Sequence, residues 1–316
     1  MASILLETLR VPSVRIVNEA QLAALAVGLS TGMIVDIGES GFSVTPIFDG
    51  CPVASCVRGG ACGGGDITKF LDTMLLSRTN ETFNQMVDRR RLEYSREVKE
   101  EHCFVPLDFD MEVEECGAFR PKTMRVLEGA KCSPMLRSYQ ACDSREYHDD
   151  ADKDHPVTKT FQLKSGNELD VKVGRERFHA PEILFQPGLW EGCDSDTSLA
   201  MVIVDSLAGL DAEAKASVLE DVVLVGGSAA LEGLGDRLEE ELKAVLPDHL
   251  QQMVDVRVPG EEVLRHRNPL SRGRPSAVSV GAEMLMEREG AEECGWITLA
   301  EMEEKQGVLE RYWYLL

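Results

Sequence analysis

The chain has 316 residues, enough for one large domain or two small ones with an ample core. Its net charge of −22 argues against direct nucleic-acid binding, and no apolar run is long enough to span a membrane. The first residues lack the basic region and apolar core of a signal peptide, and an odd number of cysteines, nine, favours reduced thiols. We therefore expect a protein of the cytoplasm or the nucleus.

Two helices are predicted first, over residues 1–10 and 19–28, the second ending at Gly28. A hairpin follows at 33–50, MIVDIGESGFSVTPIFDG, whose first strand ends in Asp36. Its turn consists of small and acidic residues, namely Gly38, Glu39, Ser40 and Gly41. A carboxylate at a strand end can hold Mg²⁺ through water, while open amides beside it can hold phosphates.

The segment after the hairpin contains three cysteines and a run of glycines. The spacing of Cys51, Cys56 and Cys62 is not that of a zinc site, and no histidine is near, so structural cysteines are favoured over a metal site. Asp66 is predicted to cap a helix over 66–77.

A polar, charged region occupies residues 79–156. Arg89, Arg90 and Arg91 predict a solvated face, and residues 93–103 predict a helix. Residues 112–156 have the composition of a surface insertion. Two histidines there, His148 and His155, could bind a cation among the aspartates, but a solvated loop is the favoured interpretation.

The sequence then predicts a hairpin at 158–173, a turn and short helix at 178–187, and a helix at 198–210. The stretch that organises the chain comes next, VVLVGGSAALEGLGDRLEEELKAVL at 222–246. It predicts a strand buried on both faces, a turn at Gly226 and Gly227, and a helix capped by Ser228.

Such a turn presents free amides and a positive helix end, and both suit phosphate. Alone it is more often a packing device. Two turns of this type, facing each other, predict a nucleotide cleft.

The remaining residues predict a strand at 253–258, a polar loop with four arginines at 261–275, and a strand-like piece leading through Gly281 into a helix at 276–285. A short terminal helix follows. The apolar end, residues 312–316, is predicted to pack on the body or to dock on a partner.

With these pieces placed, the chain resembles the actin family over nearly all of its length. MIVDIGESGFSVTPIFDG resembles the second phosphate hairpin of actins, and DVVLVGGSAALEGLGDRLEEEL resembles their adenosine-and-phosphate loop with its helix. GRERFHAPEILFQP is close to the actin motif GNERFRCPETLFQP and is the most specific match, while WITLAEMEE resembles WITKQEYDE.

The resemblance implies an α/β fold of the actin-like ATPase type, built of two ribonuclease H-like halves with ATP or ADP and Mg²⁺ in the cleft. It implies three parts with the actin subdomain boundaries: a subdomain 1 remnant, a subdomain 3-like core, and a subdomain 4-like part with an insertion at 116–156. Their ranges are 1–26 with 277–316, 27–62 with 193–276, and 63–192.

The same resemblance implies the roles of individual residues. Asp36 would position the Mg²⁺-bound water, and Glu19 stands where actins place a glutamine that orients the attacking water. The cofactor contacts would come from the hairpin, the adenosine-side helix and the glycine turn: Gly38, Glu39, Ser40, Gly41, Arg96, Lys99, Glu100, Gly226, Gly227 and Ser228.

The departures from the actin pattern weaken the predicted site. The sequence starts well inside the family pattern, so we expect the N-terminal third to be missing, with the first phosphate hairpin and its lysine. Glu19 replaces a glutamine, Ile37 a hydroxyl residue, Ser43 a histidine and Pro275 a lysine. Phosphoryl transfer depends on positioning and charge stabilisation, so we expect weak or absent ATP binding and at most a residual ATPase activity.

We therefore predict a divergent actin-related protein, a structural or assembly subunit among other actin-fold or complex subunits. The complex would be cytoskeletal (dynactin-like) and cytoplasmic, or nuclear and chromatin-remodelling. The alternative is a fragment of a complete actin-like ATP-binding ATPase that forms or caps filaments. An unrelated α/β domain with coincidental glycine turns is disfavoured, because the matches occur in the right order.

Overall fold

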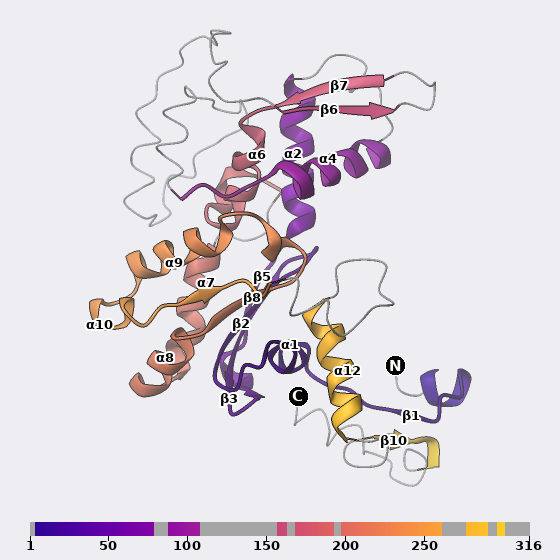
Figure 1. Ribbon diagram of the computed structural model, residues 1–316, viewed down its shortest axis with the longest axis vertical. Coiled ribbons are helices and arrows are strands. Elements are labelled where there is room, and N and C mark those ends of the chain that lie inside the picture. Colours follow the sequence, from indigo (N-terminus) through magenta and orange to yellow (C-terminus); the bar gives the residue numbers. More distant parts are fainter. Residues whose placement is uncertain are drawn as a thin grey trace.

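The computed structural model describes residues 4–78, 88–107, 157–162, 168–192, 197–260, 276–289 and 296–300. At its centre lies a mixed sheet in the order β4-β3-β2-β8-β9, with β5 paired to β3 (Figure 1). The strands are β2 (Gly32–Ile37), β3 (Phe42–Phe48), β4 (Cys51–Pro52), β5 (Arg58–Gly60), β8 (Val222–Val225) and β9 (Val256–Arg257).

Strand β2 joins the two sequence stretches that carry the glycine turns. It pairs antiparallel with β3, which confirms the predicted hairpin, and parallel with β8. In this register Asp36 lies between Ser43 and Val225. Because β2 and β8 run in the same direction, their carboxyl ends meet at one edge of the sheet, and the two turns that follow them are neighbours.

Helices cover both faces of the sheet. On one face α1 (Glu19–Val27) and α12 (Ala277–Glu289) pack against Ile34 and Ile47. On the other face lie α7 (Leu199–Ser206), α8 (Ala212–Leu219) and α9 (Leu234–Val245), in the larger core. Side chains of β8 alternate between the two cores and are all buried, which confirms a strand covered on both faces.

The contact between α1 and α12 is very close. A Cβ on Gly281 would collide with the backbone carbonyl of Leu22, so only glycine fits there. The sequence placed a strand-like piece before Gly281, and this expectation is wrong. Helix α12 runs unbroken through Gly281, which is a packing residue and not a junction.

A second group of elements lies above the sheet in Figure 1: α2 (Gly64–Arg78), α4 (Asp88–His102), α6 (Glu176–His179) and the hairpin of β6 (Val157–Gln162) and β7 (Glu168–Val173). The hairpin confirms the sequence prediction. The solvated interpretation of the arginine triplet is wrong for Arg91, which is 13% exposed and pairs with buried Asp72 at 2.9 Å.

Two helix starts differ from the prediction. Asp66 is not the N-cap of α2 but its third residue, and its Oδ2 accepts a hydrogen bond from the amide of Gly63 at 3.0 Å. Ser228 does not cap α9, which begins only after Gly233. Ser228 opens a short 3₁₀ turn (Ser228–Ala230), because the chain must first pass the segment after α4.

The remaining described elements are short: a π-helical turn (Ile4–Thr8), β1 (Ser13–Val14), α10 (Asp248–Gln251), β10 (Ile297–Thr298) and 3₁₀ turns at Ala54–Cys56, Pro181–Leu184, Pro187–Leu189 and Leu207–Gly209. The predictions for the insertion 116–156, with His148 and His155, for the loop 261–275 and for the apolar end fall outside the described residues. Of the predicted terminal helix, only residues 299–300 are described, and both are helical. None of the described helices combines the length and apolar character needed to cross a membrane.

Candidate functional site

The turn after β8 is pressed against the end of β2. Gly226 has φ +95°, a conformation that favours glycine, and a Cβ there would collide with the Asp36 carboxylate and with the carbonyl of Ile37. Gly227, the next residue, is exposed, and a Cβ on it would meet nothing within 4 Å. Gly226 therefore fixes the turn against β2, while Gly227 faces open space.

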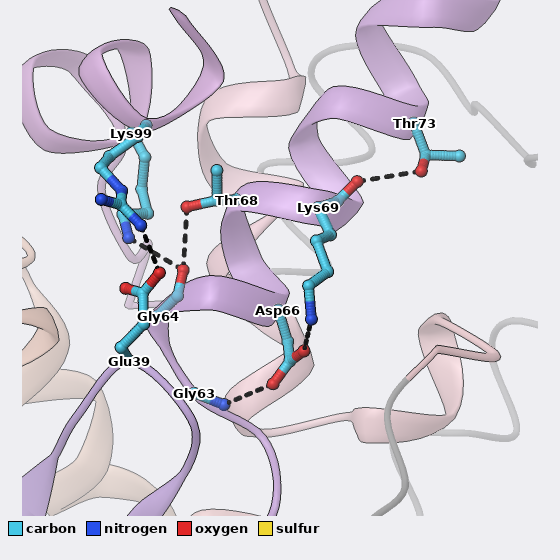
Figure 2. A network of polar contacts seen from close by, with 9 residues as sticks. Glu39, Gly63, Gly64, Asp66, Thr68, Lys69, Thr73 and Lys99 are labelled. Carbon is cyan, nitrogen blue, oxygen red and sulfur yellow. Dashed lines mark hydrogen bonds and ion pairs between the residues drawn. The ribbon is translucent and has the colours of Figure 1, made fainter. Parts of the chain in front are cut away.

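Gly64, the first residue of α2, lies between the hairpin residue Glu39 and Lys99 of α4 (Figure 2). Its amide donates to the carbonyl of Gly38 at 2.8 Å, and its own carbonyl accepts from Lys99 Nζ at 2.8 Å and Thr68 Oγ1 at 2.9 Å. A Cβ on Gly64 would collide with Ser228 Oγ. Residues that are far apart in the sequence thus meet at one backbone position.

The hairpin tip is partly engaged by the protein itself. The Gly38 amide donates to the carbonyl of Gly41 at 2.9 Å, and the Glu39 carboxylate pairs with Arg96 of α4. Within the described residues, the amides of Glu39 and Ser40 donate to no backbone carbonyl. Two amides at the tip are therefore available to a ligand, whereas the Gly38 amide and the Glu39 and Arg96 side chains already have partners.

Two carboxylates interact electrostatically near the end of β2. Burial raises the pKa of Asp36, and the negative charge of Glu19, the first residue of α1, raises it further. Among the described residues, no ion pair neutralises either carboxylate. Such a pair suits a hydrated divalent cation. A direct metal centre is not built here, because the described residues contain no group of three or more His, Cys, Asp or Glu side chains suited to one.

The cysteines of the glycine-rich segment follow the structural interpretation. Cys51 is exposed, while Cys56 and Cys62 are buried. The Cys62 thiol lies 3.6 Å from the carbonyl of Ile183, which it can donate to.

The predicted adenosine side lies on α4. Lys99 is 6% exposed, and burial lowers its pKa against the opposing effect of Glu39 and Glu100. Its ammonium group donates to Gly64, so it helps to hold the start of α2. Glu100 is exposed one position later. Arg96, Lys99, Glu39 and Ser228 are thus brought together, and their roles toward a ligand stay predictions.

Sequence reasoning missed a buried ion pair behind the site. Arg237 of α9 is 2% exposed and lies 3.2 Å from Glu182, which is fully buried. The signal was present: Arg237 falls between Leu234 and Leu238 on the apolar face of its helix, and Glu182 interrupts an apolar run. A charge at such a position indicates a partner in the interior.

The arrangement fits one side of a Mg²⁺-nucleotide site. Open amides at the hairpin tip and at the exposed turn Gly226–Gly227 suit phosphate and sugar oxygens, and the Asp36–Glu19 pair suits a hydrated cation. The glycines at positions 64 and 226 let these pieces approach each other more closely than any side chain would allow.

Comparison with known proteins identifies the family of this chain. The family model described as Actin matches residues 1–312. Actin-related protein 2 of Saccharomyces cerevisiae is 29% identical over 77% of this chain and 51% of its own length. Centractin of Schizosaccharomyces pombe is 27% identical (76% and 52%), as is actin-related protein 2 of that yeast (90% and 62%). The chain therefore spans about half to three fifths of these relatives.

Proposed function

Because this chain belongs to the actin family and so has the actin-like ATPase fold, we propose that it acts as a structural or assembly subunit that binds ATP or ADP weakly. Its partners are other actin-fold subunits of a multi-subunit complex. The leading candidate is a cytoskeletal complex of the dynactin type in the cytoplasm, and a chromatin-remodelling complex in the nucleus is the alternative.

One observation carries the weak-binding part of this proposal. The protein brings the two phosphate-type turns together through Gly64 and Gly226, yet it uses three predicted ligands internally. The Gly38 amide is bonded to Gly41, and Glu39 and Arg96 neutralise each other. A nucleotide must compete with these contacts, so its net gain in free energy is small.

The residues left for the nucleotide divide into two groups. The amides of Glu39 and Ser40 and the turn at Gly226, Gly227 and Ser228 would face the phosphates and the sugar. Asp36, with Glu19 beside it, would hold the hydration shell of Mg²⁺. The cation, when bound, neutralises charge on the phosphates.

The packing supports the proposed division into actin subdomains. Strand β1 pairs with β10, and α1 packs on α12, which joins residues 1–26 to residues 277–316. The central sheet joins residues 27–62 to residues 193–276. The elements of residues 63–192 lie together above the sheet in Figure 1.

Titration of the full chain with a fluorescent ATP analogue and Mg²⁺ tests nucleotide binding. We expect a dissociation constant of roughly 10 μM to 1 mM, which corresponds to about 4–7 kcal/mol of binding free energy. Asp36→Asn should weaken binding, whereas Glu287→Gln, an exposed acid on α12, should leave it unchanged. Nanomolar binding with efficient turnover would contradict the proposal and favour the complete ATPase.

The partner side requires a separate experiment. Affinity purification from the native source, followed by mass spectrometry, should recover other actin-fold proteins in stoichiometric amounts. Co-purification of dynein–dynactin components supports the cytoskeletal assignment, and co-purification of a remodelling ATPase supports the nuclear one. Recovery of the protein alone, as a monomer, would contradict the subunit role.

A further inference from the structure

Arg237 holds three parts of the chain together inside the protein. Its Nη2 donates to Glu182 at 3.2 Å and to Glu241 at 2.8 Å, and its Nη1 donates to the carbonyl of Pro106 at 3.1 Å. The guanidinium also lies over the ring of Phe185, 5.0 Å from its centroid. Since the arginine is 2% exposed, these contacts are shielded from solvent.

The contact with Pro106 connects Arg237 to the adenosine side of the site. Pro106 lies just after the end of α4, which carries Arg96 and Lys99. A hydrogen bond to the Pro106 carbonyl therefore fixes the exit of α4 against α9.

The start of α9, the helix that carries Arg237, is connected to the glycine turn by residues 231–233. These residues run beside the exit of α4: the Val105 amide donates to the Glu232 carbonyl at 2.8 Å. Gly233 has φ +77°, and a Cβ on it would collide with the Val105 carbonyl. The two segments are thus in backbone contact at the point where Arg237 joins them.

We propose that Arg237 is a positioning residue of the nucleotide site: by fixing the exit of α4 to the start of α9, it sets the spacing between Lys99 and the Gly226–Ser228 turn. This inference rests on the proposed function. Lys99 and Ser228 both approach Gly64, so α4 is connected to the glycine turn at Gly64 and to α9 at Pro106. These two connections together form a frame between α4 and α9.

Glu182 has a different role, that of a buried counter-ion. Its Oε1 accepts from Arg237 and from Gln186 Nε2, and its Oε2 has no hydrogen-bond partner among the described residues. Removing Arg237 alone would leave a buried carboxylate without its cation, and the fold itself would suffer. The double variant Glu182→Gln with Arg237→Met removes both charges and avoids this effect.

Hydrogen exchange on the full chain without nucleotide tests the frame. In the double variant we expect the amides of Val105 and Leu234 to exchange at least ~10-fold faster, while the amide of Met33 in β2 keeps its rate. The matched control, Glu239→Gln with Lys243→Met, removes an ion pair of 2.5 Å from the same helix and should leave all three rates unchanged. Unchanged rates at Val105 and Leu234 in the double variant would overturn the proposal.

A binding measurement then tests the consequence for the site. With the fluorescent ATP analogue and Mg²⁺, the double variant should bind ~10-fold more weakly than wild type, and the control pair should bind equally well. Arg237→Lys keeps the positive charge but not the planar guanidinium that donates to several partners at once. Its nucleotide affinity should therefore lie between that of the double variant and that of wild type. Full affinity in the double variant would reduce Arg237 to a purely structural role.

The two arms separate the inference from the proposed function. If the wild-type chain fails to bind the analogue, the proposed nucleotide binding is contradicted, and Arg237 has no nucleotide site to position. Faster exchange at Val105 and Leu234 would then show a frame between α4 and α9 that serves another purpose. Binding by wild type without any change in the double variant would leave the proposed function intact and overturn only the inference.

Discussion

At the scale of single residues, the glycines of one turn have opposite requirements. Gly226 has a positive φ and no room for a Cβ, whereas Gly227 has φ −64° and open space beside it. Both the backbone conformation and the close packing therefore require glycine at position 226. At position 227 a side chain would fit the fold and could only hinder a ligand.

Gly226→Ala should lower the free energy of unfolding by about 1–3 kcal/mol, because it strains the backbone and displaces the Asp36 carboxylate. Gly227→Ala should leave the free energy of unfolding within about 0.5 kcal/mol of wild type. Urea denaturation of both variants measures this difference. Equal stabilities would show that the Gly226 turn can relax at little cost.

Two buried titratable groups should give the stability opposite pH dependences. Burial lowers the pKa of His179 from 6.5 to about 4, and burial raises the pKa of Glu182 from 4.5 to about 7 despite nearby Arg237. Below pH 6.5 the unfolded chain takes up the histidine proton first, so stability falls as pH falls. Between pH 4.5 and 7 the folded chain holds the glutamate proton, so stability falls as pH rises.

The two effects offset each other in wild type, and single variants should reveal each one. His179→Gln should become more stable as pH falls from 7 to 4.5, and Glu182→Gln should become less stable over the same window, each with a slope of up to about 1.4 kcal/mol per pH unit. Urea midpoints across this window measure both slopes. Slopes of the same sign in the two variants would contradict the assignment.

At the scale of elements, the contact of α1 with α12 is decided by backbone proximity. Helix propensity alone favours Gly281→Ala by about 1 kcal/mol. A Cβ there would lie 1.8 Å from the Leu22 carbonyl oxygen, and that atom belongs to the backbone, so it can move only with the whole helix. The clash therefore outweighs the propensity.

Gly281→Ala should destabilise the protein by about 3 kcal/mol and loosen α12. Met286→Ala is the control, since Met286 is 63% exposed on the same helix and should change stability by less than about 0.5 kcal/mol. Thermal unfolding with circular dichroism compares the two. A more stable Gly281→Ala variant would show that the helices can separate without loss.

Local patterns predicted the central elements well. The run Val222–Val225 is apolar on every residue, so both of its faces had to be covered, and the alternation of the 158–173 hairpin was equally clear. Helix starts were less predictable, because they depend on distant partners. Ser228 looks like an N-cap in sequence, yet the bridge between Phe104 and Glu232 delays α9 to Leu234.

At the scale of the whole molecule, the sequence predicted the two turns of the site but not the contacts that join them. The parallel pairing of β2 with β8 brings Asp36 beside Val225 and places the two turns at the same edge of the sheet. The convergence at Gly64 could not be predicted, since it depends on the contact of three chain segments. The internal use of the Gly38 amide and the Glu39–Arg96 pair is likewise a property of the folded chain.

Because the nucleotide would touch segments that are far apart in the sequence, its binding should stabilise the chain as a unit. At a ligand concentration ten times the dissociation constant, linkage gives about 1.4 kcal/mol, seen as a rise in Tm. Asp36→Asn removes one of two carboxylates that repel each other, so without ligand it should be at least as stable as wild type, since burial and Glu19 both raise the pKa of Asp36. With Mg²⁺ and ATP, the Tm of Asp36→Asn should rise less than that of wild type.

Differential scanning calorimetry with and without Mg²⁺-ATP checks both parts of this prediction. Glu287→Gln serves as the control, because it removes an exposed carboxylate from α12 and should show the same Tm rise as wild type. A lower Tm of Asp36→Asn without ligand would mean that the carboxylate stabilises the fold. An undiminished rise with Mg²⁺-ATP would mean that the cation is held elsewhere, and the pairing of Asp36 with Glu19 would then need another explanation.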